Sequence, residues 1–284
     1  MDNQSGGSSR LAVLIPAYKP KIDGLELFSL QHSLNVLNQG REVYLICPQS
    51  LDHSFYSTIF PGVKFAIFDD YYFLSISAYS KLLMSKSFYE KFQKYEFVLI
   101  SQTDAILLRD ELDYWCERGF DYVGAPWPEA LSVHVNTDRY KGKDTRVLCP
   151  VGNGGLSLRR VSKCMQLIDE FPEACTEFAN NGIYEDLFFS IFGSLSDNFS
   201  IPDITTASCF SMEIAPEYFS FLSSGKVPMG GHAWWRYNVQ FWLDLLGSAA
   251  DPIREEAIRQ HAIEIEKIRL VGNQAQKAGQ NPPL

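Results

Sequence analysis

Residues 97–108 read Phe97-Val98-Leu99-Ile100-Ser101-Gln102-Thr103-Asp104-Ala105-Ile106-Leu107-Leu108, so one carboxylate stands between two apolar runs. The first run predicts a buried strand over residues 96–101, and Asp104 comes just after its end. A carboxylate between two core-forming runs would lose its hydration unless a cation paired with it. We therefore expect a divalent cation at Asp104 or, as the plainer alternative, a carboxylate that caps the next helix.

Segments on both sides of this stretch alternate between two patterns. Compact apolar runs typical of strands recur along the chain, at residues 10–15, 42–47, 63–68, 122–125 and 156–158. Apolar residues at helical spacing fill the intervals, at residues 22–37, 75–92, 111–117 and 161–170. Strands separated by helices are the pattern of a sheet covered on both faces. The predicted fold class is α/β: a three-layer α/β/α sandwich with a mostly parallel central sheet.

The chain has 284 residues, which suits one large domain with smaller additions. We expect a flexible leader at residues 1–9, the main domain at 10–247 and a C-terminal extension at 248–284. The extension contains an amphipathic helix over residues 251–270 and a loose polar tail. Its polar face suggests contact with a second copy or a partner protein, and packing on its own domain is the alternative. The polar stretch at residues 129–145 predicts a lid or a disordered loop.

Composition excludes several classes of protein. The net charge is −9, from 25 Lys and Arg against 34 Asp and Glu, and no basic cluster marks a nucleic-acid binder. Uninterrupted apolar segments reach only about five residues, far short of the ~20 needed to span a membrane. The N-terminus has no signal-peptide pattern, and the six cysteines have no CxxC spacing. We therefore expect a cytoplasmic protein with reduced thiols, which includes a peripheral place on the inner face of the membrane.

Three glycines in four positions occur in the run Gly152-Asn153-Gly154-Gly155. They allow a tight backbone that a ligand can approach closely. The run also fits part of the dinucleotide-binding fingerprint, but it lies far from the first strand and follows a Cys-Pro pair rather than a buried strand. We interpret it as a ligand-facing loop, with an ordinary turn as the alternative.

Two further motifs carry chemistry. Glu185 and Asp186 open an apolar helix, where acids can cap the N-terminus or serve a cleft. His232 follows two glycines and precedes Trp234 and Trp235. These neighbours favour a ligand-facing loop, although a histidine or tryptophan at such a place can also be purely structural.

In this order, a strand-end acid, a glycine run, an acidic pair and a late histidine resemble the GT-A glycosyltransferase fold. The chain is also similar, over about residues 11–237, to an uncharacterised bacterial glycosyltransferase-like family, a domain of unknown function. The residues that carry this resemblance are residues 95–99, Gln102-Thr103-Asp104-Ala105, Arg109-Asp110-Glu111-Leu112, Trp115-Cys116, residues 121–127, residues 152–159 and Glu185-Asp186-Leu187-Phe188.

The resemblance implies a role for each matching position. Asp104 and the late His232 would hold Mg²⁺ or Mn²⁺ on the donor's diphosphate, although Gln102 stands where the family motif has its first acid. Asp186 would be the general base, and Glu185 would orient it or bind a sugar hydroxyl. Other positions would face the donor, namely Pro16, Ala17, Tyr18, Lys19, Pro48, Gln102, Thr103, Gly154 and Gly155. Without a metal, the diphosphate would be neutralised by Lys81, Arg159 and Arg236. Sugar or acceptor contacts would come from Trp127, Asn153, Trp234 and Trp235.

The expected function is therefore transfer of a sugar from a nucleoside-diphosphate donor, by default a UDP-sugar, to a hydroxyl of a saccharide acceptor. Inversion at the anomeric carbon and a role in surface polysaccharide or glycan synthesis are expected with it. Two alternatives remain open at this point. A sugar nucleotidyltransferase would share the sheet and the acids, but the segment Pro16-Ala17-Tyr18-Lys19-Pro20 lacks its glycine- and lysine-rich loop. A non-catalytic carbohydrate- or nucleotide-sugar-binding protein could tolerate Gln102.

Overall fold

A six-stranded sheet forms the centre of the molecule in the computed structural model, which describes residues 10–38 and 40–277. The strand order is β3-β2-β1-β4-β7-β6. The strands are β1 (Leu11–Pro16), β2 (Glu42–Pro48), β3 (Lys64–Phe68), β4 (Phe97–Ser101), β6 (Tyr122–Val135) and β7 (Thr145–Arg160). The first four are mutually parallel, β7 runs antiparallel to β4, and β6 runs antiparallel to β7. The predicted α/β fold with a mostly parallel central sheet is confirmed.

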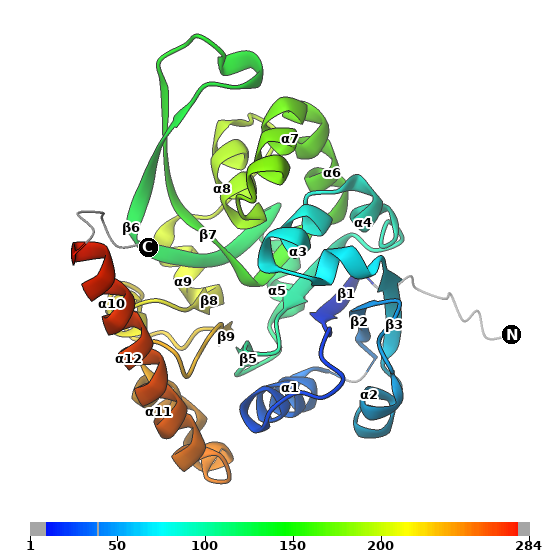
Figure 1. Cartoon of the computed structure of the whole chain (residues 1–284), viewed down its shortest axis with the longest axis vertical. Helices are drawn as coiled ribbons and strands as arrows, with labels where there is room; N and C mark the ends of the chain where they lie inside the picture. The colour runs from blue at the N-terminus through cyan, green and yellow to red at the C-terminus, as the bar shows by residue number, and fades with distance from the viewer. Residues whose placement is uncertain (1–9, 39, 278–284) are drawn as a thin grey trace, which may run out of the picture.

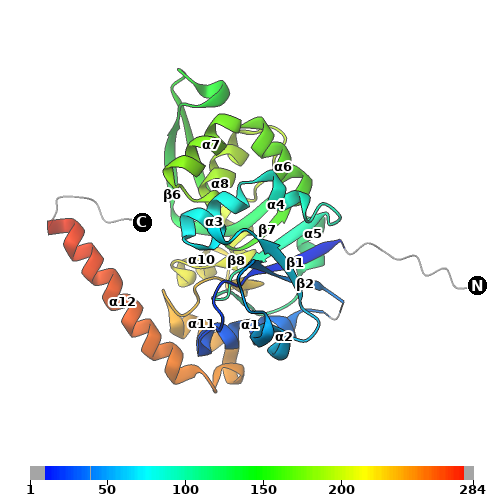
Figure 2. The ribbon, with the colours of Figure 1, turned by 45° about the vertical axis from the view of Figure 1, so that its right-hand side comes forward.

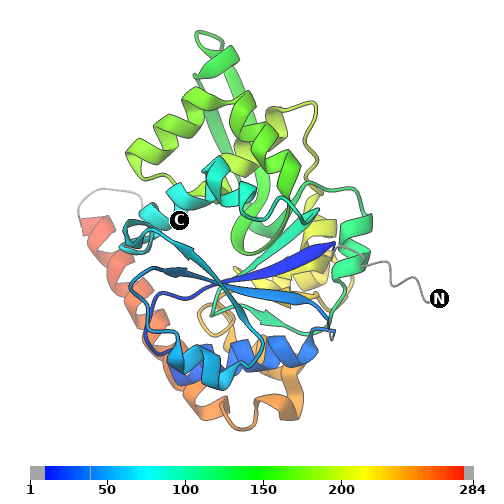
Figure 3. The ribbon, with the colours of Figure 1, turned by 90° about the vertical axis from the view of Figure 1, so that its right-hand side faces the viewer.

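Strands β1 and β4 are buried along their whole length, which explains their uninterrupted apolar sequences. In β1, Leu11, Val13 and Ile15 enter one core, and Ala12 and Leu14 enter the other. Helices cover each face (Figure 3). One layer consists of α1 (Gly24–Val36), α2 (Ser54–Ile59) and α5 (Leu112–Glu117). The other consists of α3 (Ile76–Leu83), α4 (Lys86–Glu90), α6 (Val161–Glu170), α7 (Pro172–Asn181) and α8 (Glu185–Leu195).

A second, small sheet lies beside the carboxyl end of β4. Its order is β5-β9-β8, with strands β5 (Ile106–Leu107), β9 (Gly230–Gly231) and β8 (Ser211–Met212). A third core around Trp234 and Trp242 packs against it. The helices of this region are α9 (Ile204–Phe210), α10 (Pro216–Leu222) and α11 (Val239–Leu246). Short 3₁₀ turns complete the fold, at η1 (Asp70–Phe73), η2 (Asp138–Tyr140) and η3 (Gly247–Ala250).

Several expected elements differ from those in the structure. The helix expected over residues 75–92 is two helices, because Ser85 caps the start of α4 by accepting from the Phe88 N–H. The short strands expected at 122–125 and 156–158 are the inner ends of the long strands β6 and β7. The expected lid or disordered loop at 129–145 is mostly the outer part of their hairpin, which projects from the domain (Figure 1). Its exposed surface explains why its sequence is polar.

The C-terminal helix α12 (Arg254–Lys277) is longer than expected, since it continues past residue 270. It packs on α11 at its start, and its far end projects away from the body of the molecule (Figure 2). The expected leader at residues 1–9 and the last residues of the tail, 278–284, lie outside the described residues. Within the described part of the chain, no helix is both long enough and apolar enough to cross a membrane. All six cysteines are free thiols.

Candidate functional site

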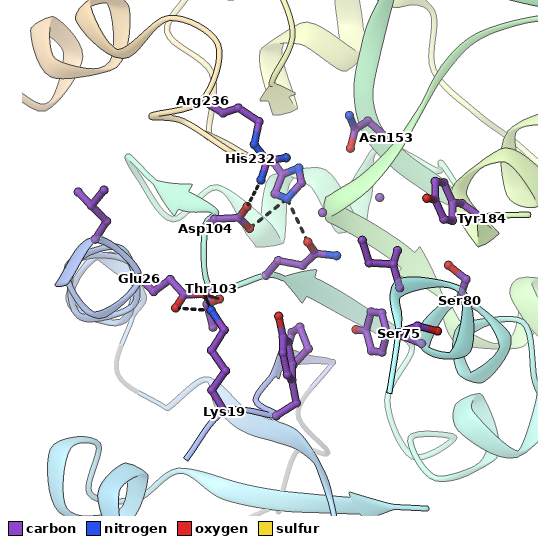
Figure 4. A pocket seen from close by; sticks show the side chains of 18 of the residues that line it. Lys19, Glu26, Ser75, Ser80, Thr103, Asp104, Asn153, Tyr184, His232 and Arg236 are labelled. Carbon is purple, nitrogen blue, oxygen red and sulfur yellow. Dashed lines mark hydrogen bonds and ion pairs between the residues drawn. The ribbon is translucent and has the colours of Figure 1, made fainter. Parts of the chain in front are cut away.

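A cleft of about 760 Å³ opens beyond the carboxyl ends of β1 and β4, where ligands bind in open parallel sheets. The segments that follow those strands form its floor, and the start of α8 and the turn before α3 form one wall. The segment after β9 and the first half of α12 form the opposite wall. Figure 4 shows Asp104, His232 and Arg236 together on one side, with Tyr184 and Ser80 across the cleft.

Asp104 and His232, which the resemblance implies as ligands of one metal ion, are in direct contact. Their side chains are joined by a 3.1 Å contact from Nε2 of His232 to Oδ1 of Asp104. The same nitrogen lies 3.0 Å from Oε1 of Gln102, and Nδ1 lies 2.7 Å from Oε2 of Glu213. Burial would lower the pKa of His232, but the carboxylates of Asp104 and Glu213 hold it well above its ordinary value. Burial would raise the pKa of Asp104, yet the charged imidazole keeps it below its ordinary value.

The small sheet explains why these groups meet. Strand β5 begins two residues after Asp104 and runs antiparallel to β9, so Asp104 lies at the end of β9 from which His232 follows. Strand β8 runs parallel to β9, and Glu213 follows it directly. Backbone pairing continues one step further, since the His232 N–H donates to the Met212 carbonyl. Asp104 does not cap a helix, because a strand comes next.

The donor atoms at this point suit a divalent cation. Oδ1 of Asp104, Oε1 of Gln102 and Nε2 of His232 converge, and carboxylate, amide and imidazole groups all serve as metal ligands. In the part of the chain that the structure describes, no three His, Cys, Asp or Glu side chains form a metal-binding group. The protein would therefore offer two strong ligands and one amide oxygen. A proton and a metal compete for Nε2, so metal binding would release that proton.

Glu185 is held by a buried ion pair. Arg159 is 0% exposed and donates from Nη2 to Oε1 of Glu185 at 2.9 Å, and Ser80 donates to the other oxygen at 2.9 Å. Gly154 lies against this pair, where an added methyl group would come within 3.0 Å of Glu185. The charge of Arg159 is thus paired with that of Glu185 inside the protein. It does not line the cleft, in contrast to the expectation that it would neutralise a diphosphate.

Asp186 lines the cleft beside Glu185 and forms no ion pair with any residue that the structure describes. Its Oδ1 accepts from the Leu187 N–H at 2.8 Å, as is common at the start of a helix. Burial, followed by the like charge of Glu185, raises the pKa of Asp186 to about 7. Desolvation and repulsion from Glu185 therefore outweigh the stabilisation of the carboxylate by the helix N-terminus. A carboxyl with this pKa exchanges protons readily near neutral pH.

The floor beyond β1 carries a second charged cluster. Nζ of Lys19 lies 2.9 Å from both carboxylate oxygens of Glu26, and Thr103 donates to Oε1 of Glu26 at 2.7 Å. The ring of Tyr18 stands beside it, 53% exposed, with Nζ of Lys19 5.8 Å from the ring centroid. Pro16 lines the same part of the cleft. This end of the cleft combines an aromatic face with polar groups that can bind hydroxyls.

Helix α12 contributes to the cleft, whereas its sequence suggested a docking contact or, as the alternative, packing on its own domain. Glu256, Gln260 and Glu264 line the wall at helical spacing. Nδ1 of His261 lies 3.0 Å from the Trp235 carbonyl, which fastens the helix to the segment that follows His232. Arg236 lies between Glu264 at 3.9 Å and Asp104 at 4.0 Å and remains 41% exposed. It is therefore a cation that an anionic ligand can reach.

Several expected site residues lie elsewhere. Trp234 is 0% exposed and donates from its indole N–H to Ser29, so it packs in the third core and cannot stack on a sugar. Trp127 covers Gly152, where an added methyl group would come within 2.5 Å of its ring. Outside the cleft lining are also Ala17, which is buried, Pro48, which ends β2, and Lys81, which donates to the Tyr71 hydroxyl. Trp235, Asn153, Gly154 and Gly155 do line the cleft.

The sequence analysis missed Glu213, Glu26 and Ser80. Glu213 had a usable signal, because a lone acid follows the apolar pair Phe210 and Met212 much as Asp104 follows β4. Glu26 and Ser80 had none, since an acid in the first turn of a helix and a serine within one are ordinary features. Their part in the cleft depends on which helix face turns toward it.

The chain matches one protein family and is similar to solved structures. Residues 62–232 match the model of a family described as "Protein of unknown function (DUF5672)". The chain is similar to the apo structure of the bifunctional glycosyltransferase WbbM, with 12% identity and a TM-score of 0.49 over 89% of this chain and 52% of that one. It therefore spans about half the length of that protein.

The chain is also similar to mouse xyloside xylosyltransferase 1 in its apo form, with 12% identity and a TM-score of 0.48 over 78% of this chain and 97% of that one. No curated protein matches the sequence. The family match, over residues 62–232, includes Asp104, Asp186 and His232. It therefore extends across the charged centre of the cleft.

Proposed function

The chain belongs to the DUF5672 family of proteins of unknown function, and we propose that this member transfers a sugar from a nucleoside-diphosphate donor to a hydroxyl of a saccharide acceptor. One observation carries the proposal. A carboxyl group with a pKa of about 7, Asp186, shares one cleft with the charged centre of Asp104, His232 and Arg236. Glycosyl transfer needs both parts: a base for the attacking hydroxyl and positive charge for the departing diphosphate. The motifs that resemble the GT-A fold support the same conclusion.

Asp186 would act as the general base. Its Oδ1 is held by the Leu187 N–H, which leaves Oδ2 to take the proton of the acceptor hydroxyl. As that proton leaves, the acceptor oxygen forms a bond to the anomeric carbon and the bond from that carbon to the diphosphate oxygen breaks. The electron pair of the broken bond stays on the diphosphate, and attack from the opposite face inverts the configuration. The transition state is oxocarbenium-like, as in glycoside chemistry generally.

Glu185 would orient the sugar rather than take the proton. Both of its oxygens already accept hydrogen bonds, from Arg159 and from Ser80. These contacts fix the carboxylate at the entrance of α8, beside Asp186. A preorganised acceptor of this kind can bind a sugar hydroxyl at little entropic cost.

The diphosphate would lie against Arg236 and the centre formed by Asp104, His232 and Gln102. A divalent cation bound there would add positive charge next to the leaving diphosphate. Asp104, His232 and Gln102 would hold it, and Arg236 approaches Asp104 from the outer side. The nucleoside would lie beyond β1, where Tyr18 offers a ring face and Lys19 and Thr103 surround Glu26. A UDP-sugar remains the default donor.

A non-catalytic binding protein is the second candidate, and Gln102 is the observation that favours it. An amide there weakens the hold on a metal compared with a carboxylate. The test is to incubate the protein and Mn²⁺ with a panel of UDP-, GDP-, CMP- and dTDP-sugars and, in a separate series, with a sugar phosphate and each nucleoside triphosphate. Free nucleotide and sugar are measured in the first series, and pyrophosphate in the second. Hydrolysis of one donor to nucleotide and sugar supports the transferase. Binding without turnover supports the second candidate, and release of pyrophosphate from a sugar phosphate and a nucleoside triphosphate would indicate a nucleotidyltransferase.

A further inference from the structure

We infer that Glu213 is a positioning residue for His232 and that its charge replaces the acid missing at Gln102. The inference rests on the proposed function in one respect, since it assumes that the Asp104 and His232 centre binds a divalent cation. It concerns a residue that neither the motifs nor the resemblance points to. Glu213 lies 109 positions from Asp104 in the chain and reaches the site only through β8.

The contact between Glu213 and His232 is short and buried. Oε2 of Glu213 lies 2.7 Å from Nδ1 of His232, and both residues are buried. Nδ1 therefore carries a proton and donates it to the carboxylate, because the carboxylate can only accept. Nε2 is then turned toward Asp104 and Gln102, at 3.1 and 3.0 Å. A carboxylate on one imidazole nitrogen that orients the other toward a metal is a common arrangement in proteins.

The backbone on both sides of the contact is held in an uncommon conformation. Ala215, two residues after Glu213, has a φ of 51°, and Ala233, next to His232, has a φ of 48°. Residues other than glycine adopt such angles only where the surrounding structure imposes them, and they are concentrated at functional sites. The two strained alanines follow the parallel strands β8 and β9, which align Glu213 with His232. An uncommon backbone conformation therefore lies within two residues of each member of the pair.

Charge gives the second reason for the assignment. A pair of acids would give the centre two negative charges, but Gln102 contributes none. Glu213 restores the second charge behind His232, where the imidazole transmits it to Nε2. Metal-bound histidines whose outer partner is removed typically lose about 10- to 100-fold in metal affinity. The same range is expected here.

Two substitutions separate the hydrogen bond from the charge. Glu213→Gln retains an oxygen that can accept from Nδ1 but removes the charge, and Glu213→Leu removes both. Glu217→Gln is the matched control, because Glu217 is an exposed acid on α10 that makes no contact with His232. Circular dichroism and urea unfolding of the full chain establish that each variant is folded.

The first readout is the ring of His232 in the metal-free protein, observed by ¹H–¹⁵N NMR. A downfield, slowly exchanging Nδ1–H signal is expected for the parent protein and for Glu217→Gln. It should weaken in Glu213→Gln and disappear in Glu213→Leu. An unchanged Nδ1–H signal in Glu213→Leu would overturn the positioning role, whether or not the protein binds a metal or transfers a sugar.

The second readout is Mn²⁺ affinity, measured from the electron paramagnetic resonance signal of free Mn²⁺. We expect a loss of about 10- to 100-fold in Glu213→Gln and a larger one in Glu213→Leu. Adding Gln102→Asp to Glu213→Gln should restore the affinity but not the strong Nδ1–H signal, since it returns charge without the hydrogen bond. Equal affinity in the parent and both variants would overturn the charge role. Absence of Mn²⁺ binding to the parent would overturn it too and would count against the metal of the proposed function, while the NMR result still decides the positioning role.

Discussion

Gly155 lies directly against the imidazole of His232, so closely that a methyl group on its α-carbon would come within 2.3 Å of three ring atoms. The glycine run expected to be a ligand-facing loop is thus part of strand β7, and its missing side chains make room for His232 and for Glu185. Only glycine at position 155 lets the ring reach Asp104 and Gln102.

Gly155→Ala should therefore displace His232 and weaken the centre. We expect lower Mn²⁺ affinity and a loss of stability of about 1–3 kcal/mol, the usual range for overpacking a filled site. Urea unfolding and Mn²⁺ titration measure the two effects. Gly24→Ala is the control, since the nearest atom to its added methyl group would be 3.8 Å away. Mn²⁺ binding in Gly155→Ala equal to that of the parent would show that the position of the His232 ring does not determine metal affinity.

Asp186→Asn should lower the transfer rate by about 10²- to 10⁴-fold with nucleotide affinity nearly unchanged. Glu185→Gln should lower the transfer rate less than Asp186→Asn does and should weaken substrate binding more. The measurements are turnover and nucleotide affinity of both variants, on the donor that the panel identifies. Turnover close to that of the parent in Asp186→Asn would mean that the base lies elsewhere.

Stability should also depend on pH through Asp186. Its pKa is about 7 in the folded protein, above the ordinary value of 3.8, so the folded state binds more protons than the unfolded state between these values. The free energy of unfolding should therefore fall as the pH rises from about 4 to about 7. Asp186→Asn should remove this component, so the free energy of unfolding of the variant should increase relative to that of the parent as the pH rises. Urea unfolding at pH 5 and 8 measures it, and a difference between the two proteins that is the same at both pH values would refute the raised pKa.

Asp104→Asn should nearly abolish transfer while the protein remains folded, and EDTA should have the same effect on the parent. The reason is that Asp104 is the one carboxylate among the three converging donor atoms. Turnover with and without EDTA, and after return of Mn²⁺, measures the effect. Full activity in EDTA would refute the metal but not the transferase. Arg236 would then carry the neutralising role, since Lys81 and Arg159 do not line the cleft.

Substitution of Arg159 should mainly affect stability, whereas substitution of Arg236 should mainly affect ligand binding. Arg159→Met leaves Glu185 buried without its partner and should destabilise the protein by about 3–5 kcal/mol. Arg236→Met, at an exposed position, should change stability little and weaken binding of nucleoside diphosphates. Urea unfolding and calorimetric titration with UDP and GDP distinguish the two. Reversed results would exchange the structural and the binding roles assigned here.

Two faces of α12 should have different roles. Glu256, Gln260 and Glu264 line the cleft, whereas Ile265 and Ile268 do not line it and are 44% and 48% exposed. We expect the double variant Ile265→Lys/Ile268→Lys to lower the mass in solution, by loss of contact with a second copy, and to leave nucleotide affinity unchanged. Gln260→Ala should weaken nucleotide binding and leave the mass in solution unchanged. Light scattering and nucleotide titration provide the measurements, and an unchanged mass in the double variant would favour simple packing of the helix on its own domain.

Much of this architecture is encoded locally in the sequence. Apolar runs such as residues 97–101 specify strands buried on both faces, because side chains alternate between the two cores. Parallel strands bring their carboxyl ends to one edge of the sheet, so the order of strands along the chain is enough to place the groups after β1 and β4 in one cleft. Asp186 at the entrance of an apolar helix can be recognised from its local sequence in the same way.

Other features depend on the tertiary structure alone. Asp104, Glu213 and His232 meet through strands of two residues each, too short to leave a periodic signal, and their contact depends on register between distant segments. Burial decides the rest: Arg159 and Trp234 have the side chains of ligand-binding residues but lie in the interior, and Asp186 acquires its pKa from the desolvation around it. The sequence thus determined which groups stand at the ends of the strands. Long-range packing decided which of them touch each other and which face the cleft.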